Sequence, residues 1–107
     1  MSEDAPIRRE RRPSIPGAIL RAHYMEPRGV SVSDLADTIG MSRKHMSQVV
    51  NGHKRIEAAL AVRLARVFDT SAAFWLNLQA AVDTYDAARD LADWTPGRTF
   101  TAPVAAE

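Results

Sequence analysis

The chain has 107 residues, of which 46% are hydrophobic and 25% charged, with a formal net charge of +1 and no cysteine. This is the composition of one globular domain, too small for the deep cleft of a large enzyme, and it excludes disulfides and thiolate metal sites. No apolar run approaches the roughly 20 residues that span a bilayer, and the N-terminus lacks the pattern of a secretory signal, so we expect a cytoplasmic protein with no membrane partner.

The two ends differ in composition from the centre. Residues 1–13 hold four arginines, three acids and two prolines. Such a segment cannot bury enough surface to offset its ordering entropy, so we expect a flexible basic arm. Residues 93–107 contain a Thr-Pro-Gly turn and few charges, and we expect a flexible tail there. Residues 14–92 then form the folded domain.

The first predicted helix begins near Pro16, because proline is tolerated in a first helical turn. It stops before Pro27 and Gly29. Apolar or weakly polar side chains recur in it at the three- and four-residue spacing of an amphipathic helix. These inward positions are Ile19, Leu20, His23 and Tyr24.

A second helix is predicted to open at Ser31, where the run to Asp34 has the form of a capping box. Leu35, Ala36 and Ile39 lie on its inner face. Gly40 closes it, because glycine readily adopts the left-handed conformation that ends helices.

Ser42 is a natural N-cap for a third helix, which carries Met46, Val49 and Val50 on its inner face and ends before Gly52.

A fourth and a fifth helix complete the domain. The fourth has apolar side chains at Leu60, Leu64, Val67 and Phe68. Ser71 caps the fifth, which extends to about Leu91 and presents Phe74, Trp75, Leu78 and Val82. No run of alternating β-branched residues predicts a strand. The fold class is therefore all-α, with five helices and two flexible tails.

Residues 32–51 have the pattern of a helix-turn-helix motif. Ala36 is small where a second helix crosses close by, and Gly40 reverses the chain. Apolar side chains occur where the two helices lock together, at Leu35, Ile39, Met41, Met46 and Val49. The whole pattern within 18 residues indicates DNA binding.

The outer face of the third helix carries hydrogen-bonding, mostly non-acidic side chains. Arginine and lysine can reach guanine, glutamine can pair with adenine, and serine adapts to either. Any exposed helix face is polar, but a face without acids favours DNA contact over simple solvation. The predicted base-reading residues are Arg43, Lys44, Ser47 and Gln48.

Other residues are predicted to contact the DNA backbone. Residues 43–68 carry six basic side chains and one acid, so positive charge is concentrated in the middle of the chain. Amide groups at the start of the second helix suit a phosphate. The predicted backbone contacts are Ser31, Val32, Ser33, Asn51, Lys54 and Arg55.

The aromatic pair Phe74–Trp75 allows two interpretations, a hydrophobic core or a pocket for a ligand or partner. Two aromatics on an amphipathic helix are more often core. The rest of the fifth helix is rich in alanine and acids, which suits close packing against a second copy away from DNA. The predicted dimerisation residues are Phe74, Leu78, Ala81, Val82 and Tyr85.

Nothing in the sequence indicates a metal site, a cofactor or a catalytic centre. His23 and His45 have no companions at metal-ligand spacing. There is no glycine-rich phosphate loop and no paired base and nucleophile, so we do not expect an enzyme.

The stretch SVSDLADTIGMSRKHMSQVVNGHKR resembles the lambda-repressor/Cro-like (XRE) helix-turn-helix family. The Pro-Gly opening of the first helix and the segment FWLNLQ extend the resemblance, over about residues 13–88, to its HigA (VapI-like) antitoxin branch. The resemblance implies a homodimer that binds a palindromic operator in double-stranded DNA and represses its own promoter. It also implies a partner, a RelE/HigB-like toxin that cleaves mRNA.

Two functions are open at this point: an autorepressing antitoxin, or a stand-alone repressor of phage or plasmid type. Both need the same DNA-reading helix, and an adjacent gene for a toxin would separate them. The arginines of the arm also have open roles, in contact with a toxin, in reaching along DNA, or neither. These arginines are Arg8, Arg9, Arg11 and Arg12.

Overall fold

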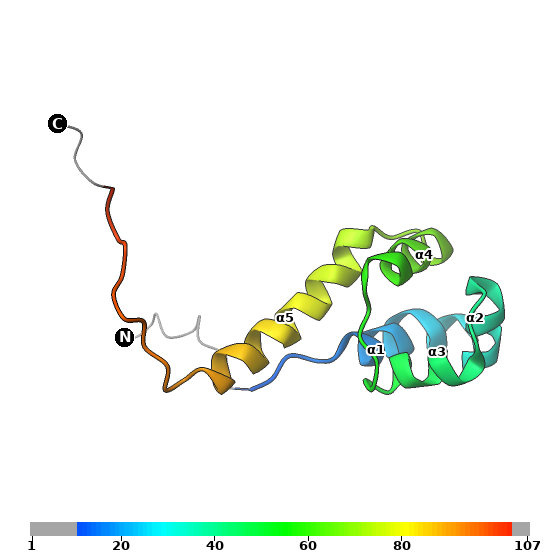
Figure 1. Cartoon of the computed structure of the whole chain (residues 1–107). Coiled ribbons are helices and arrows are strands. Elements are labelled where there is room, and N and C mark those ends of the chain that lie inside the picture. The colour runs from blue at the N-terminus through cyan, green and yellow to red at the C-terminus, as the bar shows by residue number, and fades with distance from the viewer. Residues whose placement is uncertain (1–10, 104–107) are drawn as a thin grey trace.

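The computed structural model describes residues 11–103 and folds them into five consecutive helical units (Figure 1). No strand occurs in this range, so the all-α prediction is confirmed. The expectations for residues 1–10 and 104–107 lie outside the described residues. The elements in chain order are α1 (Pro16–Ile19), η2 (Leu20–Met25), η3 (Glu26–Arg28), α2 (Val32–Ile39), α3 (Arg43–Val50), α4 (Ala58–Phe68) and α5 (Ala72–Asp90).

The first helical unit begins at Pro16 as predicted, but it changes from an α-helix to the wider π-helix in η2. The amide of Glu26, just after η2, bonds to the carbonyl of Arg21, five residues back. The wider turn places Leu20 and Met25 in the core, and His23 is exposed. His23 is thus a surface histidine rather than a packing one, and the three- and four-residue spacing that grouped it with Leu20 assumed a uniform α-helical repeat.

The predicted helix ends are confirmed where they depend on local hydrogen bonds. The Ser31 hydroxyl accepts from the Asp34 amide at 3.0 Å, and the Asp34 carboxylate accepts from the Ser31 amide at 3.2 Å. The Ser42 and Ser71 hydroxyls cap α3 and α5 by accepting from the amides three residues on, without a reciprocal carboxylate. Gly40 ends α2 with a φ of 88°, a conformation that side chains disfavour.

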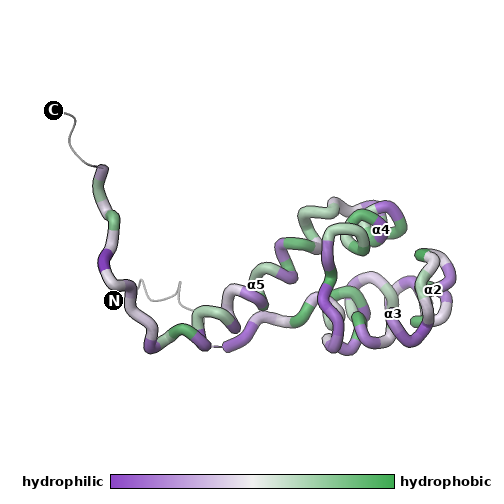
Figure 2. The backbone as a smooth tube through the Cα atoms, in the orientation of Figure 1, coloured by the Kyte–Doolittle hydropathy of each residue, from purple (hydrophilic) through white to green (hydrophobic). Residues whose placement is uncertain are grey.

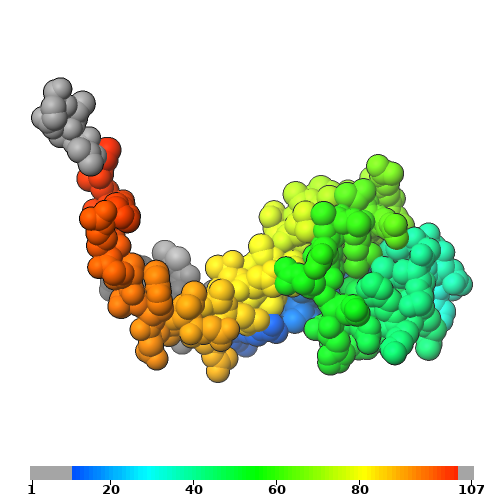
Figure 3. Space-filling view, in the orientation of Figure 1, coloured from blue at the N-terminus to red at the C-terminus, as the bar shows by residue number. Residues whose placement is uncertain are grey.

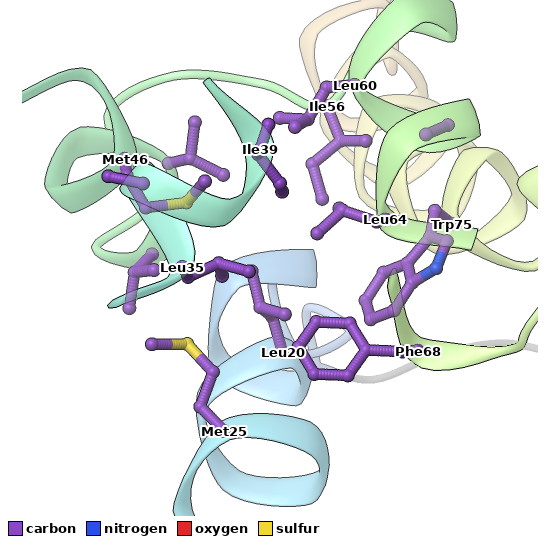
Figure 4. Packing of buried hydrophobic residues seen from close by; sticks show 14 of the residues in the cluster. Leu20, Met25, Leu35, Ile39, Met46, Ile56, Leu60, Leu64, Phe68 and Trp75 are labelled. Carbon is purple, nitrogen blue, oxygen red and sulfur yellow. The ribbon is translucent and has the colours of Figure 1, made fainter. Parts of the chain in front are cut away.

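One hydrophobic core joins all five units (Figure 4). Its centre lies between the α1–η2 segment, the α2–α3 pair and the α4–α5 pair. Burying such side chains contributes about 1.5–3 kcal/mol each. The largest fully buried side chains are Leu20, Leu35, Met46, Val49, Ile56, Leu64 and Trp75.

Helix α4 differs from the prediction at one position. Leu60, Leu64 and Phe68 are buried as expected, but Val67 is 39% exposed. Two buried alanines, one of them Ala65, widen the buried face of this helix on the side away from Val67. Val67 thus lies at the edge of this face, about 90° from its centre at 100° per residue.

Trp75 is completely buried, which confirms the core interpretation for this residue. Its indole nitrogen donates to the Thr70 hydroxyl at 2.7 Å, so the one polar atom of the ring is satisfied. The Tyr24 ring packs edge-on against it with centroids 5.1 Å apart. Phe74 packs on the same two rings but is only half-buried.

The segment after α5 stands away from the folded body (Figure 3). Residues 91–103 are exposed and contain no helix or strand. Across the described residues, no helix combines the length and the apolar character needed to cross a membrane.

Gly17 marks the closest approach of the first helix to α3, and replacing it tests this packing. A Cβ atom at Gly17 would collide with the backbone carbonyls of Val49 and Val50, which cannot move without displacing α3. We expect Gly17→Ala to lower the free energy of unfolding by about 3 kcal/mol in urea denaturation. Gly97→Ala is the matched control, because a Cβ there meets no atom within 4 Å. Equal effects of the two substitutions would contradict the packing described.

Candidate nucleic-acid interface

Helices α2 and α3 form a helix-turn-helix unit. The turn between them consists of Gly40, Met41 and Ser42. The Gly40 and Met41 amides both bond to the Ala36 carbonyl, at 2.8 and 3.0 Å, which holds the turn tightly. The apolar residues predicted to lock the helices are buried, apart from Met41, which is half-buried: Leu35, Ile39, Met46 and Val49.

The outer face of α3 is polar and free of acids. Lys44 is exposed, while Ser47 and Gln48 are half-buried. No aspartate or glutamate occurs between residues 38 and 56. The buried side of the same helix is formed by Met46, Val49 and Val50. Three of the four predicted base-reading residues thus share one face directed away from the core.

Arg43, the fourth predicted base-reading residue, lies at the edge of this face nearest to α2. Its Nε donates to the Ser33 hydroxyl at 2.8 Å. This bond joins the first turn of α3 to the first turn of α2. The structure therefore brings Arg43 next to a residue predicted to contact phosphate, and holds it toward the rim of the α3 face.

The first turn of α2 contains the predicted backbone contacts Ser31, Val32 and Ser33. The Ser31 hydroxyl is engaged in the capping box, and Val32 packs half-buried against the core. Ser33 is exposed. The N-terminus of the helix still presents backbone amides and a positive dipole end, the usual setting for a phosphate.

Asn51 follows α3 directly and is held from two sides. Its side-chain Nδ2 donates to the Ser47 hydroxyl at 3.3 Å, and its Oδ1 accepts from the Arg21 guanidinium at 3.0 Å. Arg21 comes from η2 and was not singled out in the sequence, because 30 residues separate it from Asn51. It extends the basic surface beside α3.

The loop between α3 and α4 carries the remaining predicted contacts. Figure 2 shows it as a mainly hydrophilic stretch. Lys54 is exposed, and its amide bonds to the Gln48 carbonyl at 3.2 Å. The Lys54 ammonium group is thus attached to backbone that is hydrogen-bonded to the end of α3.

Arg55, in the same loop, has a partner elsewhere in the chain. Its guanidinium donates to both carboxylate oxygens of Asp83 in α5, at 3.0 and 2.5 Å, and lies 3.5 Å from Glu57. These bonds hold the pKa of Asp83 below its ordinary value. The structure therefore directs Arg55 toward α5, which separates it from Lys54.

A second arginine–aspartate pair joins the start of the described chain to α5. Arg12 donates to Asp86 at 2.8 and 2.7 Å and lowers the pKa of that carboxyl group. Arg11 is exposed. Arg8 and Arg9 lie outside the described residues.

Helix α5 keeps an apolar stripe that the monomer covers only in part. Phe74, Leu78, Ala81 and Tyr85 are half-buried and follow one another at intervals of four, three and four residues. This spacing repeats one helix face every seven residues, as in packed helix pairs. Val82, the fifth predicted dimerisation residue, is only 3% exposed and belongs to the interior of the monomer.

The fold and this surface define a helix-turn-helix protein, in which α3 packs against α1 and α2 and turns a polar face outward. The helix-turn-helix family (HTH_3) matches residues 22–75. The chain belongs to this family, and within it to the HigA-like branch of the lambda-repressor/Cro-like group.

Three similar proteins illustrate the relationship. The chain is 42% identical over 76 residues to an uncharacterized HTH-type transcriptional regulator, YbaQ of Escherichia coli K12, covering 71% of this chain and 67% of YbaQ. It is 36% identical over 77 residues to antitoxin HigA-1 of Vibrio cholerae, covering 72% of each. The structure of Pseudomonas aeruginosa antitoxin HigA with the higBA promoter has a TM-score of 0.73 at 35% identity, over 77% of this chain and 89% of that one.

Proposed function

We propose that this protein is a DNA-binding repressor that recognises an operator with the outer face of α3. The observation that supports this most directly is the acid-free face of Lys44, Ser47 and Gln48 on a helix set in helix-turn-helix geometry. The similar Pseudomonas aeruginosa HigA was solved with its promoter, which supports the same use of the fold here.

In this proposal α3 lies in the major groove, which is wide enough for an α-helix and displays a distinct pattern for each base pair. Lys44, Ser47 and Gln48 face the base edges, and Arg43 reaches them from the rim. The first turn of α2 and the side chains of Asn51 and Lys54 contact phosphates on either side. Arg55 is left out of this set, because its guanidinium is paired with Asp83.

Two substitutions separate base reading from phosphate contact. Gln48→Ala should relax sequence preference at one base pair and cost about 1–3 kcal/mol for the operator. Lys54→Ala should weaken binding to all sequences and reduce the slope of affinity against salt by about 1. Titrations of operator and scrambled DNA at several salt concentrations measure both. If the two variants lose the same affinity for both DNAs, the division of the surface is wrong.

We further propose that the protein binds DNA as a homodimer formed through α5. The apolar stripe of Phe74, Leu78, Ala81 and Tyr85 supports this, because the monomer leaves it half-exposed at a helix-pairing spacing. A two-fold dimer presents its two reading helices to half-sites about 34 Å apart, which implies a palindromic operator. Val82 belongs to the interior of the monomer and is left out of this interface.

Two neighbouring alanines test the dimer proposal. Ala81→Glu places a charge in the stripe, and we expect it to give a monomer in sedimentation experiments at micromolar concentration. Ala80→Glu introduces the same charge on the exposed side of α5 and should leave the dimer intact. A wild-type monomer at this concentration, or equal dissociation of the two variants, would rule out the stripe as the interface.

We also propose that the protein is the antitoxin of a toxin–antitoxin pair and neutralises a RelE/HigB-like toxin. Its similarity to antitoxin HigA-1 supports this. Co-expression with the product of the adjacent open reading frame should yield a stable complex and relieve growth arrest by that product. A neighbour that neither binds nor arrests growth would favour the stand-alone repressor.

A further inference from the structure

Gln79 is the one buried polar side chain among residues 11–103, with 8% of its surface exposed. It lies on α5, on the side that faces the core, together with Trp75 and Val82. Its Oε1 accepts a hydrogen bond from the Ile56 amide at 2.8 Å, and its Nε2 donates to Asp83 Oδ1 at 3.1 Å. The side chain thus uses both ends of its amide to join α5 to the loop after α3.

Asp83 continues the connection back to the same loop. It lies one turn after Gln79 on α5 and accepts both hydrogen bonds from the Arg55 guanidinium. Two consecutive loop residues, Arg55 and Ile56, are therefore bound by two α5 residues. The backbone bond to Gln79 is buried, whereas the ion pair to Asp83 is exposed and contributes little by itself.

On the side that faces α5, packing holds the loop at Ile56, whose neighbours Arg55 and Glu57 are exposed. An open groove of about 800 Å³ is lined by loop residues 52–57 and by side chains from the start of the described chain and from α3, α4 and α5, so part of the loop faces solvent there. The Ile56 side chain enters the core with 1% exposure. Without the Gln79 acceptor its amide would be buried without a partner, which is unfavourable enough to move the backbone.

We propose that Gln79 is a positioning residue for DNA binding: it fixes the Ile56 amide and thereby sets the loop that presents Lys54 to the DNA backbone. The inference rests on the proposed DNA-binding function.

The test compares Gln79→Met with Val82→Ala. Methionine keeps the length of the side chain but removes both hydrogen bonds. Val82 is also buried on α5 and makes no side-chain hydrogen bond, so its truncation loosens the helix without releasing the loop. The readouts are operator affinity, its salt dependence, and exchange of the Ile56 amide with solvent, at a temperature where both variants are folded.

We expect Gln79→Met to weaken operator and scrambled DNA alike, by about five- to tenfold, and to reduce the salt slope by about 1. Preference for the operator over scrambled DNA should be unchanged, because the α3 face is intact. In the Lys54→Ala background the same substitution should have little further effect on the slope. Ile56 exchange should accelerate in Gln79→Met but not in Val82→Ala.

The outcomes separate this inference from the function it rests on. If the wild type binds its operator but Gln79→Met and Val82→Ala share one salt slope, or the Ile56 amide stays protected in Gln79→Met, the positioning role is wrong. If the wild type prefers no DNA sequence, the proposed function itself fails.

Discussion

The packing of the Trp75 indole holds together the helices that support the helix-turn-helix. The indole reaches from α5 into the core and meets the Tyr24 ring of η2, while Thr70 in the preceding turn accepts its N–H. Tyr24 in turn packs edge-on against Phe68 at the end of α4, with centroids 5.5 Å apart. Three helical units that do not belong to the helix-turn-helix are thereby fixed to one another. The α2–α3 pair packs against these three units, so the direction of α3 depends on Trp75, a buried residue that DNA could not contact.

The three sides of helix α5 make different contacts. One side carries Trp75, Gln79 and Val82 into the monomer. The acids Asp83 and Asp86 beside it hold Arg55 and Arg12. The third side is the apolar stripe. The acids thus pair with Arg12 and Arg55, whereas Lys44 and Lys54 form no ion pair with any acid of residues 11–103.

The sequence predicts most closely those features that depend on neighbours in the chain. Capping by Ser31, Ser42 and Ser71, the turn at Gly40 and the two faces of α3 follow from hydrogen bonds and spacings within a few residues, and the helix-turn-helix could be located from them. The π-turn of η2 could not be predicted, because its stability comes from core packing rather than from a local signal. The pairing of Arg55 with Asp83 spans 28 residues. The basic side chain of Arg55 and its place in a loop do not reveal this partner. The sequence therefore predicts the same DNA-backbone contact for Arg55 as for Lys54.

The separation of these contacts along the chain also has a consequence for folding. Residues that close the helix-turn-helix turn are four or five positions apart, whereas Gln79 and Ile56 are 23 apart and Arg12 and Asp86 are 74 apart. Closing a longer loop costs more chain entropy before any contact offsets it. We therefore expect the α2–α3 helix-turn-helix to form early. The loop after α3 then becomes fixed only when α5 docks, and the Arg12–Asp86 pair forms last. On unfolding, that exposed pair is where the structure should begin to open.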